Sequence, residues 1–195
     1  MQRVPCLTLG MILVAATFVA GCGGHKAASI SELQPGFAAN AEQKQSEKLV
    51  VSQLWAQTDI ESKLMLLVYY HHRAENYLKD FKALGNVQTN RHNETEALTT
   101  MMLVVAAGDT MNYLRTVGDL LVVYKKITQN ADREAVKPTI KSSFDANIES
   151  IGRSMKQVDV ALSLTKSPAI AASATALKQD LREIKTLLES IVDLP

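Results

Sequence analysis

The chain has 195 residues, of which 47% are hydrophobic and 21% are charged, which is the composition of one globular domain with an appendage. Its formal net charge is +1 and its charges of opposite sign are interleaved. We therefore expect no nucleic-acid partner, because phosphate binding needs clustered Lys and Arg.

The amino-terminal segment has the layout of an export signal. Arg3 precedes an uninterrupted run of apolar and small residues, Leu7 to Ala20. A helix of these 14 residues would be about 21 Å long. That length is short of the roughly 30 Å hydrocarbon core of a bilayer. The run is therefore predicted to be the hydrophobic region of a signal peptide rather than a membrane span.

The run ends in Val19-Ala20-Gly21-Cys22, which resembles the lipobox of bacterial lipoproteins. The resemblance implies cleavage of residues 1–21, attachment of diacylglyceryl and often palmitate to Cys22, and anchoring of the mature chain in a cell membrane. Gly23 rather than Asp follows the cysteine, which in this class points to the outer membrane, facing the periplasm, in a Gram-negative source. The alternative is a signal anchor that is not cleaved.

Residues 22–40 are expected to be the lipidated cysteine and a flexible tether, and residues 41–195 a helical body. The tether contains Gly23-Gly24 and a Pro35-Gly36 turn but no sustained periodicity. Eighteen flexible residues have an r.m.s. reach of about 23 Å. Because Cys6 would leave with the signal peptide, the mature chain cannot form an intrachain disulfide.

Apolar residues recur at spacings of three and four through the body, a pattern that predicts amphipathic helices. The first helix is predicted over about residues 41–84, with a stop at Gly85-Asn86. The second is predicted over about 94–129, with Asn93 as its N-cap and Glu96 completing a capping box. Its middle, Met101–Gly108, is apolar on all sides, which predicts deep burial.

The third helix is predicted over about 131–166, with a break or kink near Pro138, because proline disrupts a helix interior. The fourth is predicted over 168–194 and begins at Ser167-Pro168, an N-cap residue followed by proline in the first turn. Four long helices with short connections predict an all-α fold, an antiparallel up-down four-helix bundle.

The densest group of polar and aromatic residues is Tyr69–Tyr77, YYHHRAENY. His71 falls on the apolar stripe of its helix and is predicted to point inwards, so Tyr70 and His71 are the candidate cofactor-binding residues. The alternative is a hydrogen-bonded core histidine with tyrosines at the edge of the core. His72 is rotated by about 100° from His71, and no Glu-x-x-His pair or Cys-x-x-Cys-His motif is present. No metal site is therefore expected.

We expect a non-enzymatic protein, with no catalytic residue and no cofactor. The sequence has no Gly-x-Ser-x-Gly, His-Glu-x-x-His or phosphate-binding glycine loop. The expected function is that of a membrane-anchored envelope lipoprotein that acts as an interaction, scaffold or accessory module for an envelope protein partner. The alternative is a ligand-sensing or carrier bundle for haem, metal or a small molecule that uses Tyr69–Tyr77. Self-association through the long first helix is a third hypothesis.

Overall fold

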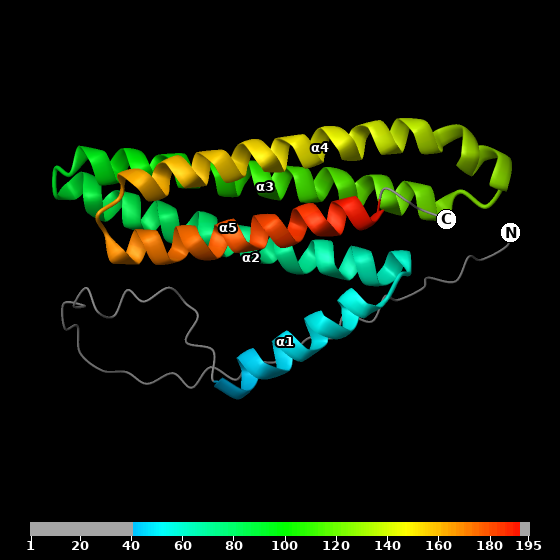
Figure 1. Ribbon diagram of the computed structural model, residues 1–195, viewed down its shortest axis with the longest axis horizontal. Coiled ribbons are helices and arrows are strands. Elements are labelled where there is room, and N and C mark those ends of the chain that lie inside the picture. The colour runs from blue at the N-terminus through cyan, green and yellow to red at the C-terminus, as the bar shows by residue number, and fades with distance from the viewer. Residues whose placement is uncertain (1–40, 192–195) are drawn as a thin grey trace, which may run out of the picture. The chain divides into compact units, whose positions relative to one another are not determined.

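The computed structural model of the protein describes residues 41–191, with side chains from residue 45 onwards. Five helices follow one another (Figure 1): α1 (Ala41–Ala56), α2 (Ile60–Asn90), α3 (Glu94–Lys126), α4 (Asn130–Leu164) and α5 (Pro168–Ile191). No strand occurs between residues 41 and 191, so the all-α prediction is confirmed. The predicted signal peptide, Cys22 and the tether lie outside the described residues.

Helices α2 to α5 pack around one core. The helix pairs in contact are α2–α3, α3–α4, α4–α5 and α2–α5, with a smaller contact between α3 and α5. Their buried apolar stripes, which include Phe81, Leu121, Phe144 and Leu181, form a single cluster. Within residues 41–191, no helix is both long enough and apolar enough to cross a bilayer.

The pairing of α2 with α3 has a defined register. Glu61, near the start of α2, forms an ion pair of 2.5 Å with Lys125, near the end of α3. Gly85, near the end of α2, lies against Thr100, near the start of α3. The two helices therefore run in opposite directions, and a residue near the start of α2 faces one near the end of α3.

The prediction of one continuous helix over residues 41–84 is wrong at its beginning, because the chain breaks at residues 57–59 and starts again. The two carboxylate oxygens of Asp59 accept hydrogen bonds of 2.8 Å from the backbone N–H and the hydroxyl of Ser62. Asp59 thus caps the free N–H groups of a new helix. Lys63 then lies 5.6 Å from the centre of the Trp55 ring. The Trp55 indole donates to the Tyr70 hydroxyl, so α1 packs along α2 instead of extending it.

The predicted stop at Gly85-Asn86 is also wrong, because α2 continues to Asn90. A Cβ atom placed on Gly85 would lie 2.9 Å from Oγ1 of Thr100. The glycine therefore permits a close approach of two helices rather than ending one of them. The connection that follows contains His92, whose φ of 55° is in the left-handed region.

The start of α3 is capped as predicted, since the Asn93 side chain accepts a hydrogen bond of 3.3 Å from the backbone N–H of Glu96. The Glu96 side chain does not complete the predicted capping box. Its carboxylate instead accepts hydrogen bonds from the Thr165 hydroxyl at 2.6 Å and from the backbone N–H groups of Lys166 at 2.5 Å and Ser167 at 3.1 Å. Glu96 thereby fixes the connection between α4 and α5.

Of the break or kink predicted near Pro138, the break is wrong, because α4 is one helix from Asn130 to Leu164 with Pro138 inside it, and the kink stays a prediction. The turn before the proline is held to α3 through Arg133, which donates to the Ile127 carbonyl at 2.7 Å and lies 5.7 Å from the centre of the Tyr124 ring. These contacts offset the hydrogen bond that Pro138 removes. Helix α5 begins at Pro168 as predicted, and the Ser167 hydroxyl accepts a hydrogen bond of 3.5 Å from Ile170.

Candidate functional site

The segment Met101–Gly108 is not deeply buried on all sides, contrary to the prediction. Leu103, Ala106 and Ala107 are buried, but Met101 is 64% exposed and Val105 43% exposed. The core therefore takes only one face of α3. Neither α2 nor α4 covers the opposite, outward face or the side chains that project from it. An apolar face is therefore left in contact with solvent.

This outward face continues onto α4. The exposed large apolar residues at this end of the helices are Leu98, Met101, Val105, Val160 and Leu164, which we call the apolar tip surface. Glu96 contacts Thr165, and the Gln157 side chain donates to the Met102 carbonyl at 2.9 Å. Leu98 and Met101 lie between these two contacts on α3, and Val160 and Leu164 lie between them on α4. The surface therefore spans two neighbouring helices.

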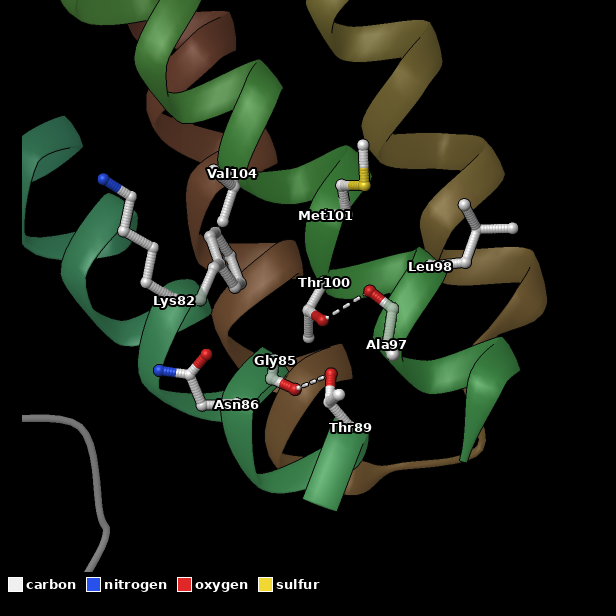
Figure 2. A pocket seen from close by; sticks show the side chains of 10 residues that line it. Lys82, Gly85, Asn86, Thr89, Ala97, Leu98, Thr100, Met101 and Val104 are labelled. Atoms are coloured by element: carbon white, nitrogen blue, oxygen red, sulfur yellow. Dashed lines mark hydrogen bonds between the residues drawn. The ribbon is translucent and has the colours of Figure 1, made fainter. Parts of the chain in front are cut away.

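A hollow of about 470 Å³ opens between α2 and α3 beside the apolar tip surface (Figure 2). Leu98 and Met101 belong to both features, and Val104 and Lys82 line the hollow further along α3 and α2. Gly85 also lines the hollow, and α2 lies close to α3 there, because a Cβ atom on Gly85 would lie 2.9 Å from Oγ1 of Thr100. The apolar tip surface and the hollow together form an uneven and largely apolar surface.

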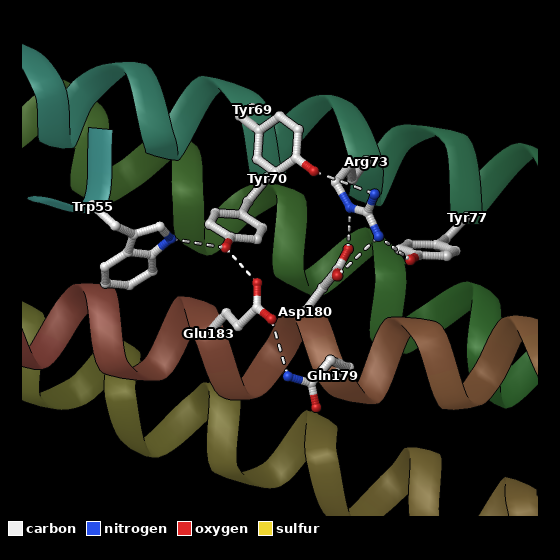
Figure 3. Close-up of polar contacts among 8 residues, drawn as sticks. All are labelled: Trp55, Tyr69, Tyr70, Arg73, Tyr77, Gln179, Asp180 and Glu183. Atoms are coloured by element: carbon white, nitrogen blue, oxygen red, sulfur yellow. Dashed lines mark hydrogen bonds and ion pairs between the residues drawn. The ribbon is translucent and has the colours of Figure 1, made fainter. Parts of the chain in front are cut away.

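Tyr70, one of the two predicted site residues, is buried in a polar network between α2, α5 and α1 (Figure 3). Its hydroxyl donates to the Glu183 carboxylate at 2.6 Å and accepts from the Trp55 indole at 3.4 Å. Gln179 donates to the other oxygen of Glu183 at 2.9 Å. Burial, and the hydrogen bond to Glu183, raise the pKa of Tyr70 well above its usual value. The hydroxyl is therefore a neutral structural donor.

The same network contains an ion pair between α2 and α5. The Arg73 guanidinium donates to the two carboxylate oxygens of Asp180 at 2.5 and 3.0 Å, and also to the hydroxyls of Tyr69 and Tyr77 (Figure 3). Burial raises the pKa of Asp180, and the hydrogen bonds from Arg73 oppose that rise. In the described part of the chain, every buried side-chain nitrogen and oxygen has a hydrogen-bond partner. The network therefore holds α1, α2 and α5 together.

His71, the second predicted site residue, lies on another side of α2, because successive residues of a helix are about 100° apart. It is half-buried and lines a groove of about 270 Å³ between α2 and α3. The structure therefore does not bring Tyr70 and His71 together in one site. Among residues 41–191, no three His, Cys, Asp or Glu side chains are grouped so that they could hold a metal ion.

Comparison with known proteins finds no matching family model, no matching curated protein and no matching solved structure. Sequence reasoning missed the apolar tip surface, although its signal was present: α3 is apolar on more sides than one core can cover. It also missed the pairing of Arg73 with Asp180, which are 107 residues apart and for which the sequence offered no signal.

Proposed function

We propose that this protein is a cell-envelope lipoprotein whose helical body is a non-enzymatic interaction module. In this proposal the chain is cleaved before Cys22 and anchored through lipid on that cysteine, in the outer membrane if the source is Gram-negative. Helices α2 to α5 are an up-down-up-down bundle, and α1 joins the bundle to the tether. The lipobox-like Val19–Cys22 supports the anchor.

The observation that carries the interaction function is the apolar tip surface. Leu98 is 55% exposed and Met101 is 64% exposed, and the three valine and leucine residues beside them are between 40% and 47% exposed. Isolated exposed apolar residues are normal, but several of them on neighbouring segments of two helices, beside a hollow, are typical of a protein-binding surface. A protein partner that covers these side chains would remove them from water.

Site-specific photo-crosslinking tests this function in the bacterium that produces the protein. A photoreactive amino acid at Leu98 should form an adduct with one envelope protein. The matched control is Val123, which is 57% exposed on the same helix and lies about 37 Å away along the axis. Position 123 should not form that adduct.

The substitution Met101→Asp provides a second test in the same crosslinking experiment. It should abolish the adduct formed at position 98 while the helical circular dichroism signal stays unchanged, because Met101 is an exposed residue. Adducts that are the same from positions 98 and 123, or that survive Met101→Asp, would contradict a binding role for the apolar tip surface.

A second candidate function is that of a small-ligand carrier, and one observation favours it. A groove opens beside His71 instead of solid packing. Haem and metal are less well supported than an organic ligand, because the tyrosines nearest to His71 in sequence are engaged in the polar network. Soaking the purified protein with a panel of small molecules and measuring its thermal unfolding tests this function. A ligand should raise the melting temperature, and His71→Ala should reduce that rise.

A further inference from the structure

Helix α1 is attached to the bundle by one small contact. Among the helices of residues 41–191, it packs against α2 alone. The apolar side chains that it turns towards the core, Val51, Leu54 and Trp55, are only half-buried. A helix of 16 residues is marginal in water by itself, so α1 depends on this contact. The fully buried core comes from α2 to α5, so α1 can leave without opening it.

The surface that α1 covers is specific. The Lys63 ammonium nitrogen lies 5.6 Å from the centre of the Trp55 ring, and the Trp55 indole donates to the Tyr70 hydroxyl at 3.4 Å (Figure 3). Burial raises the pKa of Tyr69, and a hydrogen bond to Glu47, earlier in α1, also raises it. Helix α1 therefore recognises Lys63, Tyr69 and Tyr70, all on α2.

The hinge between α1 and α2, residues 57–59, contains nothing that forces the chain to bend. It reads Gln-Thr-Asp, and neither Gly nor Pro occurs between Leu54 and Ser62. A continuous helix through the hinge is therefore sterically allowed. All three hinge residues are exposed. The bend is held by the Asp59 cap on Ser62 and by the docking of α1 on α2.

We propose that α1 is an exchangeable arm, which leaves α2 of its own chain and docks on α2 of a second copy while residues 57–59 become helical. The second copy presents the same three side chains, so each exchanged arm regains the contacts that it gave up. The dimer gains backbone hydrogen bonds through the hinge and loses the Asp59 caps. Exchange of an identical element is for this reason a low-cost route to a dimer. It requires no contact at the apolar tip surface.

A straight chain without a second copy is unfavourable. It would leave the Trp55 ring in water and uncover Lys63 and Tyr70, which are 7% and 1% exposed in the bent chain. The straight form therefore needs the α2 surface of another copy, and its population should rise with protein concentration.

Cross-linking between two differently tagged copies of the protein tests the exchange. One copy carries Glu47→Cys and the other carries Tyr69→Cys. A short bismaleimide should join the two tags, because α1 of one copy then lies on α2 of the other. Mixtures that lack one of the two substitutions control for reaction at Cys6 and Cys22. The adduct should increase with protein concentration, and its absence from folded protein at every concentration overturns the proposal.

Two substitutions of Asp59 are a matched pair, because both remove the cap. The φ of Asp59 is −72°, which suits proline in the bent chain, whereas proline inside a continuous helix clashes with the preceding turn. Sedimentation equilibrium in density-matched detergent measures the dimer. Asp59→Ala should lower the dimer dissociation constant roughly tenfold, because exchange no longer costs two caps. Asp59→Pro should remain monomeric, and equally stable dimers of the two variants would overturn the exchange.

Two further readouts separate exchange from other events. Trp55 is the only tryptophan of the chain, and its surroundings are the same in the bent monomer and in the exchanged dimer. Its emission should therefore not change on dimerisation, and a red shift in Asp59→Ala without the adduct shows that α1 merely detaches. A chain with both cysteines, bridged within the monomer beforehand, should no longer dimerise. A dimer that survives this bridge forms through another surface, and the proposal is then wrong.

Discussion

Gly85 in α2 and Thr100 in α3 approach so closely that a single added methyl group on the glycine would lie 2.9 Å from the threonine hydroxyl oxygen. That hydroxyl cannot move away freely, because it donates to the carbonyls of Glu96 and Ala97 at 3.0 and 2.8 Å. The pair sets how closely the end of α2 packs against the start of α3, beside the hollow next to the apolar tip surface.

Gly85→Ala should therefore destabilise the protein, although alanine is the better helix former. Overpacking costs about 1–3 kcal/mol, and the gain in helix propensity is only about 1 kcal/mol. Gly108→Ala is the control and should stabilise the protein by about 0.5–1 kcal/mol, because its Cβ position is open. Urea unfolding measures both.

The same contact makes a stricter test possible. In a Thr100→Ala background the obstructing oxygen is absent, so Gly85→Ala should change sign and become stabilising. A Gly85→Ala effect that is the same with and without Thr100 would show that the close approach is not what requires glycine.

The ion pair between Arg73 and Asp180 holds α2 to α5. Asp180→Ala should lower the free energy of unfolding by about 3 kcal/mol or more, because it leaves a largely buried guanidinium without its carboxylate. The double variant Arg73→Met/Asp180→Leu should lose less than Asp180→Ala alone. Denaturant unfolding of the wild type and the variants measures these free energies. Losses from changing Arg73 and Asp180 that are strictly additive would contradict coupling between the two residues.

The Glu96 carboxylate holds the connection between α4 and α5 through three hydrogen bonds. Glu96→Ala should destabilise the protein by about 2–3 kcal/mol, since charge-assisted bonds are lost at a buried position. Hydrogen exchange should locate the effect, with faster exchange at the amides of Lys166 and Ser167. Unchanged exchange at those two amides would contradict this role.

How far the sequence predicts this structure depends on whether a signal is local. Asn93 as a cap and Pro168 as a first helical residue are local signals, and both are found. Asp59 is also a local N-cap signal. That signal was obscured because the apolar periodicity continues on both sides of the residue. Gly85 was misread as a stop, because its role depends on a residue of another helix.

In the candidate site too, local sequence signals are separate from features that depend on another helix. His71 could be placed near an apolar stripe from the sequence, but the groove beside it is also lined by residues of α3 such as Gly118, which is 47 residues away along the chain. Tyr70 is adjacent to His71 in sequence and faces other helices. The sequence shows that α3 is apolar on more sides than one core can cover, but it does not indicate which side the bundle leaves uncovered, so the exposure of Met101 and Leu98 in particular could not be predicted.

Buried tyrosines should make the protein sensitive to alkaline pH. Burial raises the pKa values of Tyr69, Tyr70 and Tyr77 above the ordinary value of 10.0. Because the folded-state values are higher than the unfolded ones, the stability from these groups is fully present below pH 10 and is lost as the pH rises above it. The urea concentration at the unfolding midpoint should therefore be lower at about pH 11 than at about pH 9.

The matched variant for this pH dependence is Tyr70→Phe. It should be less stable than wild type near neutral pH, because it removes the donor to Glu183. It should also show a smaller fall in the urea midpoint at alkaline pH, because one shifted group is absent. An equal fall in both proteins would argue against ionisation of Tyr70 as a cause.

The anchor at Cys22 is the central claim, and mass spectrometry of the mature amino terminus tests it most directly. The protein should be isolated from membranes of the cells that produce it, with a Cys22→Ser variant as the control. We expect the mature chain to begin at Cys22, with a diacylglyceryl group on its sulfur, and the variant to remain uncleaved and without lipid. A mature chain that retains residues 1–21, or that carries a free thiol at Cys22, would contradict the claim.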